Sequence, residues 1–231
     1  MLALAGLALS SSQASAEIPP AGQAIVGRSL ATYELNGTRY SVFSNVVSFS
    51  VLPAYGLSVT PDGTTDSPAW LARAFGGETV SFAFRIKNSG NAEDGFNLSI
   101  AYPAPSDFLP AKAAIYLGVV QDSIIVMGDT EITAVGPLQP GEEVSLFIAA
   151  TLPPGLTGGE VAHIDLVACS DADRTRCDMG NVVRIEARRE AQVALTLAAD
   201  GTTALPGDSI GFAIHFANAG ERTATDIALS S

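Results

Sequence analysis

Alternation of apolar and polar residues is the dominant pattern along the chain. In 80–87, 161–168 and 210–217, every second residue is apolar. A period of two places alternate side chains on opposite faces of a β-strand, so each segment predicts a strand with one buried face. The positions expected to face a core are Val80, Phe82, Phe84, Ile86, Ala162, Ile164, Leu166, Ala168, Ile210, Phe212, Ile214 and Phe216.

Turn signals separate these strands at short intervals. Segments 24–35 and 38–52 also have the pattern of strands, and they meet at Asn36-Gly37. That dipeptide tolerates the positive φ angles of a type I′ turn, so a tight hairpin is expected there. Proline and glycine punctuate the rest, as at Pro153-Pro154-Gly155. Short strands with one apolar face and frequent turns predict an all-β chain built from immunoglobulin-like antiparallel β-sandwiches.

One stretch, 67–75, has the pattern of a short helix. Ser67 can cap its first turn, and Leu71 and Phe75 are four residues apart and would share one face. We expect this helix to cover an open end of the sandwich, with the only tryptophan, Trp70, as its anchor. Stacking of Trp70 against a ligand is the alternative.

The chain also resembles itself. Residues 77–90 align with 207–220 at an offset of 130, and Asn45-Val46-Val47 recurs at 181–183. Such internal similarity is typical of tandem structural repeats.

The repeats divide the chain into four parts. Two strands cannot bury a core alone, so the outer parts are expected to be pieces of further sandwiches in a longer tandem array. The parts are a signal peptide at 1–16, an N-terminal β-hairpin segment or partial repeat at 17–53, a complete immunoglobulin-like sandwich at 54–190, and the truncated start of a second sandwich at 191–231.

Three motifs resemble those of a known family. They are Asn88-Ser89-Gly90-Asn91 with its continuation to Leu98, the run from Gly128 to Glu142, and the run from Leu152 to Ser170. Together they look like the bacterial conserved repeat called domain of unknown function eleven. The resemblance implies immunoglobulin-like repeats in secreted, cell-surface and outer-membrane proteins. Relatives often have an Asp/Asn/Gly-rich loop where this chain has 119–123, so we expect no cation site there.

The N-terminus has features of an export signal. Residues 2–9 form an apolar run, and Ala14-Ser15-Ala16 matches a cleavage pattern. The run is far shorter than the roughly 20 residues that span a bilayer. We therefore expect an exported chain without a membrane span, located in the periplasm, at the outer membrane or cell surface, or outside the cell.

The two cysteines fit an oxidising compartment. Cys169 and Cys177 flank a polar turn between strand-like runs, and we expect them to form a disulfide. Two free thiols or a metal pair are the alternatives, but the chain has no third cysteine and no histidine between the two. Asp171, Asp173 and Asp178 could gather Ca²⁺, although a solvated polar turn is the favoured interpretation because the spacing lacks a recognised calcium loop.

Charge and composition narrow the function classes. The 231 residues carry a formal charge of −12, which disfavours binding to nucleic acid or to an anionic membrane surface. Only two histidines are present, His163 and His215, and both are expected on the outer faces of strands. We therefore expect no catalytic residues, no metal site and no cofactor.

Two functional hypotheses follow. The first is a non-catalytic structural or interaction repeat of the bacterial cell envelope, with other repeats of the same chain or envelope and surface proteins as partners. The second is an accessory carbohydrate-associated sandwich of an extracellular enzyme, with a glycan as ligand. The candidate ligand-binding residues are the aromatic side chains Tyr33, Tyr40 and Trp70.

Overall fold

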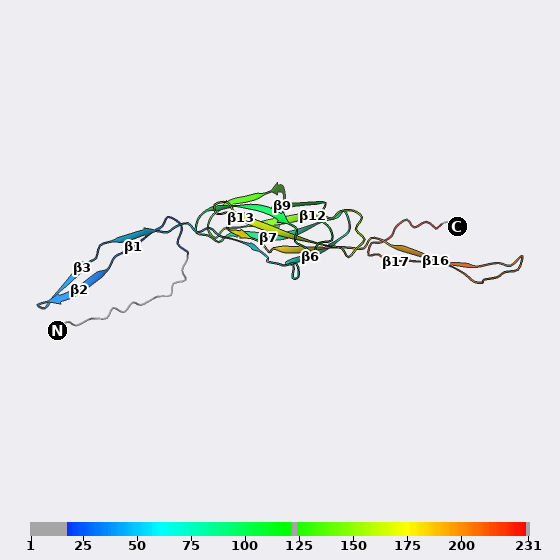
Figure 1. Ribbon diagram of the computed structural model, residues 1–231, viewed down its shortest axis with the longest axis horizontal. Helices are drawn as coiled ribbons and strands as arrows, with labels where there is room; N and C mark the ends of the chain where they lie inside the picture. The colour runs from blue at the N-terminus through cyan, green and yellow to red at the C-terminus, as the bar shows by residue number, and fades with distance from the viewer. Residues whose placement is uncertain (1–17, 122–123, 230–231) are drawn as a thin grey trace.

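The computed structural model describes residues 18–121 and 124–229 and forms strands joined by turns. A central sandwich lies between two extended strand pairs, one at each end (Figure 1). No helix in the described ranges is long and apolar enough to cross a bilayer. The predicted signal peptide, 1–16, lies outside the described residues.

The central sandwich has two sheets, which we call sheet 1 and sheet 2. All pairings are antiparallel except that of β15 with β6. Sheet 1 has the order β10 (Ile124–Ile132), β9 (Lys112–Gln121), β12 (Glu143–Thr151), β7 (Thr79–Asn88) and β5 (Leu57–Thr60). Sheet 2 has the order β11 (Ala134–Leu138), β8 (Asp94–Ala101), β13 (Val161–Ser170), β15 (Val182–Ala187) and β6 (Trp70–Ala74), with β14 (Cys177–Asp178) paired to β13.

The predicted alternation sets the core. Phe82, Phe84 and Ile86 of β7 are buried, and the intervening side chains face outward. All four predicted core positions of β13 are likewise fully buried. The fold class predicted from the sequence, an all-β sandwich, is therefore confirmed.

The predicted helix at 67–75 is wrong. The structure has β6 at Trp70–Ala74, an edge strand that runs parallel to β15 with Val183 opposite Trp70. A helix this short is marginal without tertiary support. Pairing with the open edge of β15 instead satisfies the backbone, and it leaves Phe75 buried and Leu71 exposed.

The N-terminal strand pair, which we call the N-arm, comprises residues 24–50. In it β1 (Ala24–Gly27) pairs with β4 (Val47–Ser50), and β2 (Leu30–Leu35) pairs with β3 (Thr38–Phe43). The expected hairpin turn is confirmed, because Asn36 and Gly37 have φ values of 53° and 76°. The register of β1 and β4 repeats that of β13 and β15 in sheet 2. Ile25 lies opposite Phe49, as Ala162 lies opposite Ile185.

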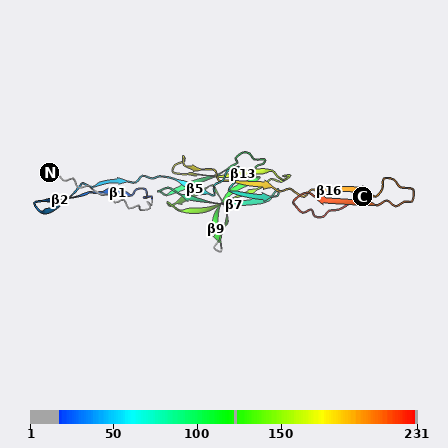
Figure 2. The same cartoon turned by 90° about the horizontal axis from the view of Figure 1, so that it is seen from below.

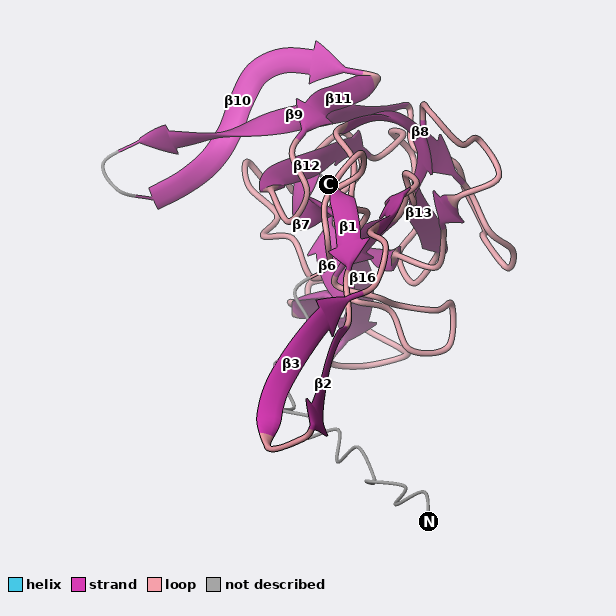
Figure 3. Cartoon of the chain, turned by 90° about the vertical axis from the view of Figure 1, so that its left-hand side faces the viewer, coloured by secondary structure: helices cyan, strands magenta, loops and turns pink. Residues whose placement is uncertain are grey.

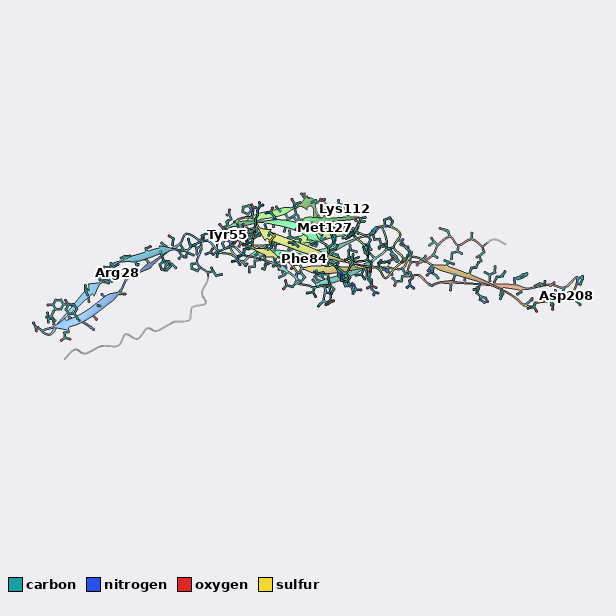
Figure 4. The ribbon with its side chains drawn as sticks, in the orientation of Figure 1. Arg28, Tyr55, Phe84, Lys112, Met127 and Asp208 are labelled. Carbon is teal, nitrogen blue, oxygen red and sulfur yellow. A yellow bond between two sulfur atoms is a disulfide. The ribbon has the colours of Figure 1, made fainter. Side chains whose placement is uncertain are left out.

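The C-terminal strand pair, the C-arm, comprises β16 (Val193–Ala199) and β17 (Phe212–Asn218). Its register repeats that of β5 and β7 in sheet 1. Leu195 lies opposite Phe216, as Val59 lies opposite Ile86. The two arms leave the sandwich in opposite directions, with Arg28 on one and Asp208 near the tip of the other (Figures 2 and 4).

A buried asparagine ends β7, and its counterpart ends β17. The Asn88 Nδ2 donates to the carbonyl oxygens of Ala92 and Leu138, and its Oδ1 accepts from the Gly90 N–H. Asn218 makes the equivalent bonds to Arg222 and Gly220, but it is exposed and lacks the Leu138 partner. The asparagine shared by 77–90 and 207–220 thus has one role in both segments: its side-chain hydrogen bonds close the turn that follows the strand.

Glu160 closes the turn that precedes β13. Its carboxylate accepts from the Thr157 N–H and hydroxyl at 2.8 and 2.6 Å, and from the Gly158 N–H at 2.6 Å. The hydroxyl bond from Thr157, followed by the backbone bonds, lowers the pKa of Glu160 from 4.5 to about 2. The turn is therefore stabilised by the ionised form.

Replacement of Asn88 by alanine should destabilise the sandwich by roughly 2–3 kcal/mol, because buried carbonyl groups lose their donor. Chemical denaturation measures the change. The matched variant Asn218→Ala removes a similar set of bonds from an exposed site and should cost less than about 0.5 kcal/mol. Equal losses in the two variants would contradict the assigned role of burial.

The Glu160 turn should also respond to pH. A carboxyl whose folded pKa is depressed stabilises the fold above its unfolded pKa of 4.5, and the contribution is lost as pH falls through about 2. Titration of the Thr157 and Gly158 amide resonances should show an inflection near pH 2. The inflection should be absent in Glu160→Gln. An inflection at the ordinary glutamate value would show that these bonds do not hold the carboxylate.

Candidate functional site

The outer face of sheet 1 carries a hollow of about 360 Å³, which we call the Trp70 trough. It lies between the edge strand β6 of sheet 2 and the β9–β10 hairpin, which extends beyond the rest of the sandwich (Figure 3). Its lining is mainly apolar, and it contains one of the three aromatic residues selected from the sequence. The lining residues are Thr60, Pro61, Trp70, Ala83, Phe84, Arg85, Ile125, Ser145 and Phe147.

A gap in strand pairing positions Trp70. β5 pairs only with residues 85–88 of β7. The part of the β7 edge before Arg85 therefore has no β5 partner. There the Trp70 Nε1–H donates to the Ala83 carbonyl oxygen at 3.1 Å. This bond fixes the indole ring, yet Trp70 remains 48% exposed.

Small outward-facing residues form the floor. Ala83 lies opposite Phe147, and Arg85 lies opposite Ser145 in the β7–β12 register. Beyond Ser145, a Cβ on Gly118 would lie 2.8 Å from the Ser145 Cβ, so this position requires glycine. The floor therefore stays low between Trp70 on one side and Ile125 on the other.

One ion pair adds charge at the edge of the trough, which we call the rim: Arg85 is a lining residue, and its partner Glu143 lies just outside the lining. The Arg85 Nη1 lies 3.2 Å from the Glu143 Oε1, and both side chains are exposed. Sequence reasoning selected Trp70 but missed Phe147, although Phe147 is an outward-facing aromatic residue in an alternating strand. Ile125 lines the trough only because the β9–β10 hairpin folds over sheet 1, and the sequence around Ile125 does not reveal this fold.

The tyrosine candidates lie elsewhere. Tyr33 and Tyr40 are cross-strand neighbours in the N-arm, with ring centroids 5.3 Å apart and planes at 18°. Both are exposed. They form a stacked pair of their own and do not join Trp70 in one site.

His163 lies on the predicted outer face of its strand but is buried there. It faces outward from β13 as expected, but it is only 4% exposed because the 102–111 loop covers it. Its Nδ1 lies 2.6 Å from the Pro105 carbonyl oxygen, which can only accept, so Nδ1 carries the proton. The Nε2 is buried without a hydrogen-bond partner. His163 and its cross-strand neighbour Arg184 line a separate hollow of about 440 Å³ together with Asp66 and Asp107. His215 lies exposed in the C-arm.

The predicted disulfide is confirmed. Cys169 and Cys177 face each other across β13 and β14 and are bonded. Two nearby aspartates have structural roles. Hydrogen bonds from the Thr175 hydroxyl and N–H lower the pKa of Asp173 within the turn. Asp178 accepts from the Val59 N–H and so links β14 to β5. Across the described parts of the chain, no three His, Cys, Asp or Glu side chains group closely enough to hold a metal ion.

Comparison with known proteins gives no family. No protein-family model matches the chain, and neither does any curated protein, so the resemblance to the bacterial repeat stays a prediction.

Solved structures show limited likeness. A family 123 glycoside hydrolase from Clostridium perfringens matches with 10% identity and a TM-score of 0.35, over 59% of this chain and 28% of that one. A PapD-like domain of human CEP192 matches with 13% identity and a TM-score of 0.32, over 58% and 84%. The C-terminal domain of the Streptococcus pyogenes antigen I/II-family protein AspA matches with 9% identity and a TM-score of 0.29, over 63% and 50%.

Removal of the disulfide should lower stability by about 2–3 kcal/mol, because the bond closes a loop of sequence separation 8 and restricts the unfolded chain. The double variant Cys169→Ala, Cys177→Ala and chemical denaturation measure this. Reduction of the native protein should give a similar loss. A loss below about 0.5 kcal/mol would show that the β13–β14 pairing holds the loop without the bond.

Proposed function

We propose that this protein is a non-catalytic structural repeat of the bacterial cell envelope. Each arm is part of a sandwich adjacent to the central one, and its exposed face is covered by strands of that adjacent unit. The N-arm supplies strands equivalent to β13, β14 and β15. The C-arm supplies strands equivalent to β5 and β7.

The exposure of the C-arm is the observation that carries the proposal. Val59 and Ile86 are 1% and 0% exposed in the central sandwich. Their register equivalents, Leu195 and Phe216, are 55% and 59% exposed. Apolar side chains in core positions of a sheet need a second sheet, and a contiguous apolar face of this kind marks an interaction surface.

The joint to the N-arm is ordered by one buried side chain. The Asn91 Nδ2 donates to the carbonyl oxygens of Pro19 and Leu52, and its Oδ1 accepts from the Ala54 N–H at 2.7 Å. These bonds tie both segments that lead into the N-arm to one end of the sandwich. A fixed joint is what a spacer of stacked units requires.

The joint to the C-arm is ionic and aromatic. Arg188 and Arg222 lie over the ring of Phe75, with guanidinium carbons 4.4 and 4.6 Å from its centroid. Arg188 pairs with Glu221 at 3.1 Å, and Arg222 pairs with Glu190 at 3.1 Å. The cluster thus connects the central sandwich to the start of the next unit.

Export is supported by the Cys169–Cys177 disulfide, which persists in oxidising compartments. The predicted signal at 1–16 and the charge of −12, which favours solubility, agree with that location.

Completion of the second sandwich should protect the C-arm. At the offset of 130, Ser231 corresponds to Ala101, so a second copy of residues 102–190 is appended after it. Hydrogen exchange should then slow in β16 and β17 by at least about 100-fold relative to the original chain, because a buried strand opens with unfolding of its unit.

The control extension carries Leu195→Asp, which places a charge at the position equivalent to Val59 and should abolish the protection. If the appended copies of Cys169 and Cys177 form their disulfide while β16 and β17 exchange as fast as before, the arm is not part of such a unit.

A further inference from the structure

We infer that the Trp70 trough binds a neutral saccharide, with a sugar ring stacked on the half-exposed Trp70 and hydroxyl groups bonded to Arg85 and Glu143. This site lies on the outer face of the central sandwich, away from both arms. It therefore goes beyond the structural role proposed above and does not depend on it.

The indole is prepared for stacking. Its N–H is held by the Ala83 carbonyl oxygen, so the ring loses little freedom when a ligand binds. Half of the residue remains exposed, although burial of an aromatic ring is favourable. A fixed, half-exposed tryptophan beside an apolar hollow offers a platform for a flat ligand with an apolar face.

The shape of the trough favours a ring. Ala83 and Ser145 keep the floor low, while Trp70, Phe147 and Ile125 rise around it. The volume of about 360 Å³ lies within the usual range for small-ligand sites. An outward leucine at position 83 would fill this space.

The rim favours hydroxyl groups. Arg85 only donates hydrogen bonds and Glu143 only accepts them, and the two lie 3.2 Å apart. A sugar hydroxyl both donates and accepts, so neighbouring hydroxyls can use both side chains at once. An apolar peptide side chain could fill the trough but would make no use of the ion pair.

Charge selects a neutral ligand. The guanidinium of Arg85 is already compensated by Glu143, and the whole chain carries −12. An anionic sugar would be repelled by this field, because Arg85 is the one cation among the lining residues and it is already paired. Lys87, which lies opposite Glu143 in the register, is outside the lining.

The only tryptophan of the chain provides the measurement. The native protein is titrated with three neutral hexasaccharides, the β-1,4-linked oligomers of glucose, xylose and N-acetylglucosamine, while Trp70 emission is recorded. At least one should give a saturable change. Ala83→Leu, which keeps the fluorophore, should weaken binding at least about tenfold, and the matched control Ser81→Leu on the same outer face should leave it unchanged.

Binding to the variant Trp70→Ala, which lacks the fluorophore, is measured by calorimetry. Loss of binding supports the site if the circular dichroism spectrum of the variant is unchanged. The inference is overturned if none of the three oligomers gives a saturable change, or if Ala83→Leu binds as well as the native protein. Saturable binding of an apolar peptide with no response to any sugar would overturn it too, and would assign the trough to a protein partner.

Discussion

Burial of one sheet face by another is the interaction on which this structure depends. Val59 and Leu195 occupy the same place in equivalent strand pairs, yet one is buried and the other is exposed. The hydrogen bonds within each pair are alike, so pairing alone does not distinguish them. Apolar burial contributes about 25 cal/mol per Å², and only the central unit gains it across two sheets. The presence of a second sheet therefore explains both the buried core of the sandwich and the exposed apolar side chains of the C-arm.

Local sequence predicted what depends on local periodicity. The buried faces of β7 and β13, the Asn36-Gly37 hairpin and the Cys169–Cys177 bond follow from residue spacing, and the structure contains all of them. The error at 67–75 arose because capping and spacing describe an isolated segment, whereas the open edge of β15 decides its conformation. His163 was placed on the correct face, but the loop that covers it comes from a distant part of the chain.

The same limit applies to the trough. Trp70 was selected as a lone tryptophan, but its setting depends on β5 ending early, on β6 passing beside β7 and on the β9–β10 hairpin returning over sheet 1. These are contacts between segments far apart in the sequence. A site of this type is built from side chains that are ordinary in their own strands, so no motif marks it.

The two joints differ in chemistry although the offset of 130 carries Asn91 of one joint onto Glu221 of the other. Asn91 holds one joint with neutral amide hydrogen bonds, which ionic strength barely affects. At the corresponding position, Glu221 pairs with Arg188 within a cluster of charges. Salt screens such charges, with a Debye length of about 10 Å at 0.1 M. A filament that alternates such joints would bend unevenly as the surrounding salt changes, softening at the charged joints while the amide joints keep their stiffness.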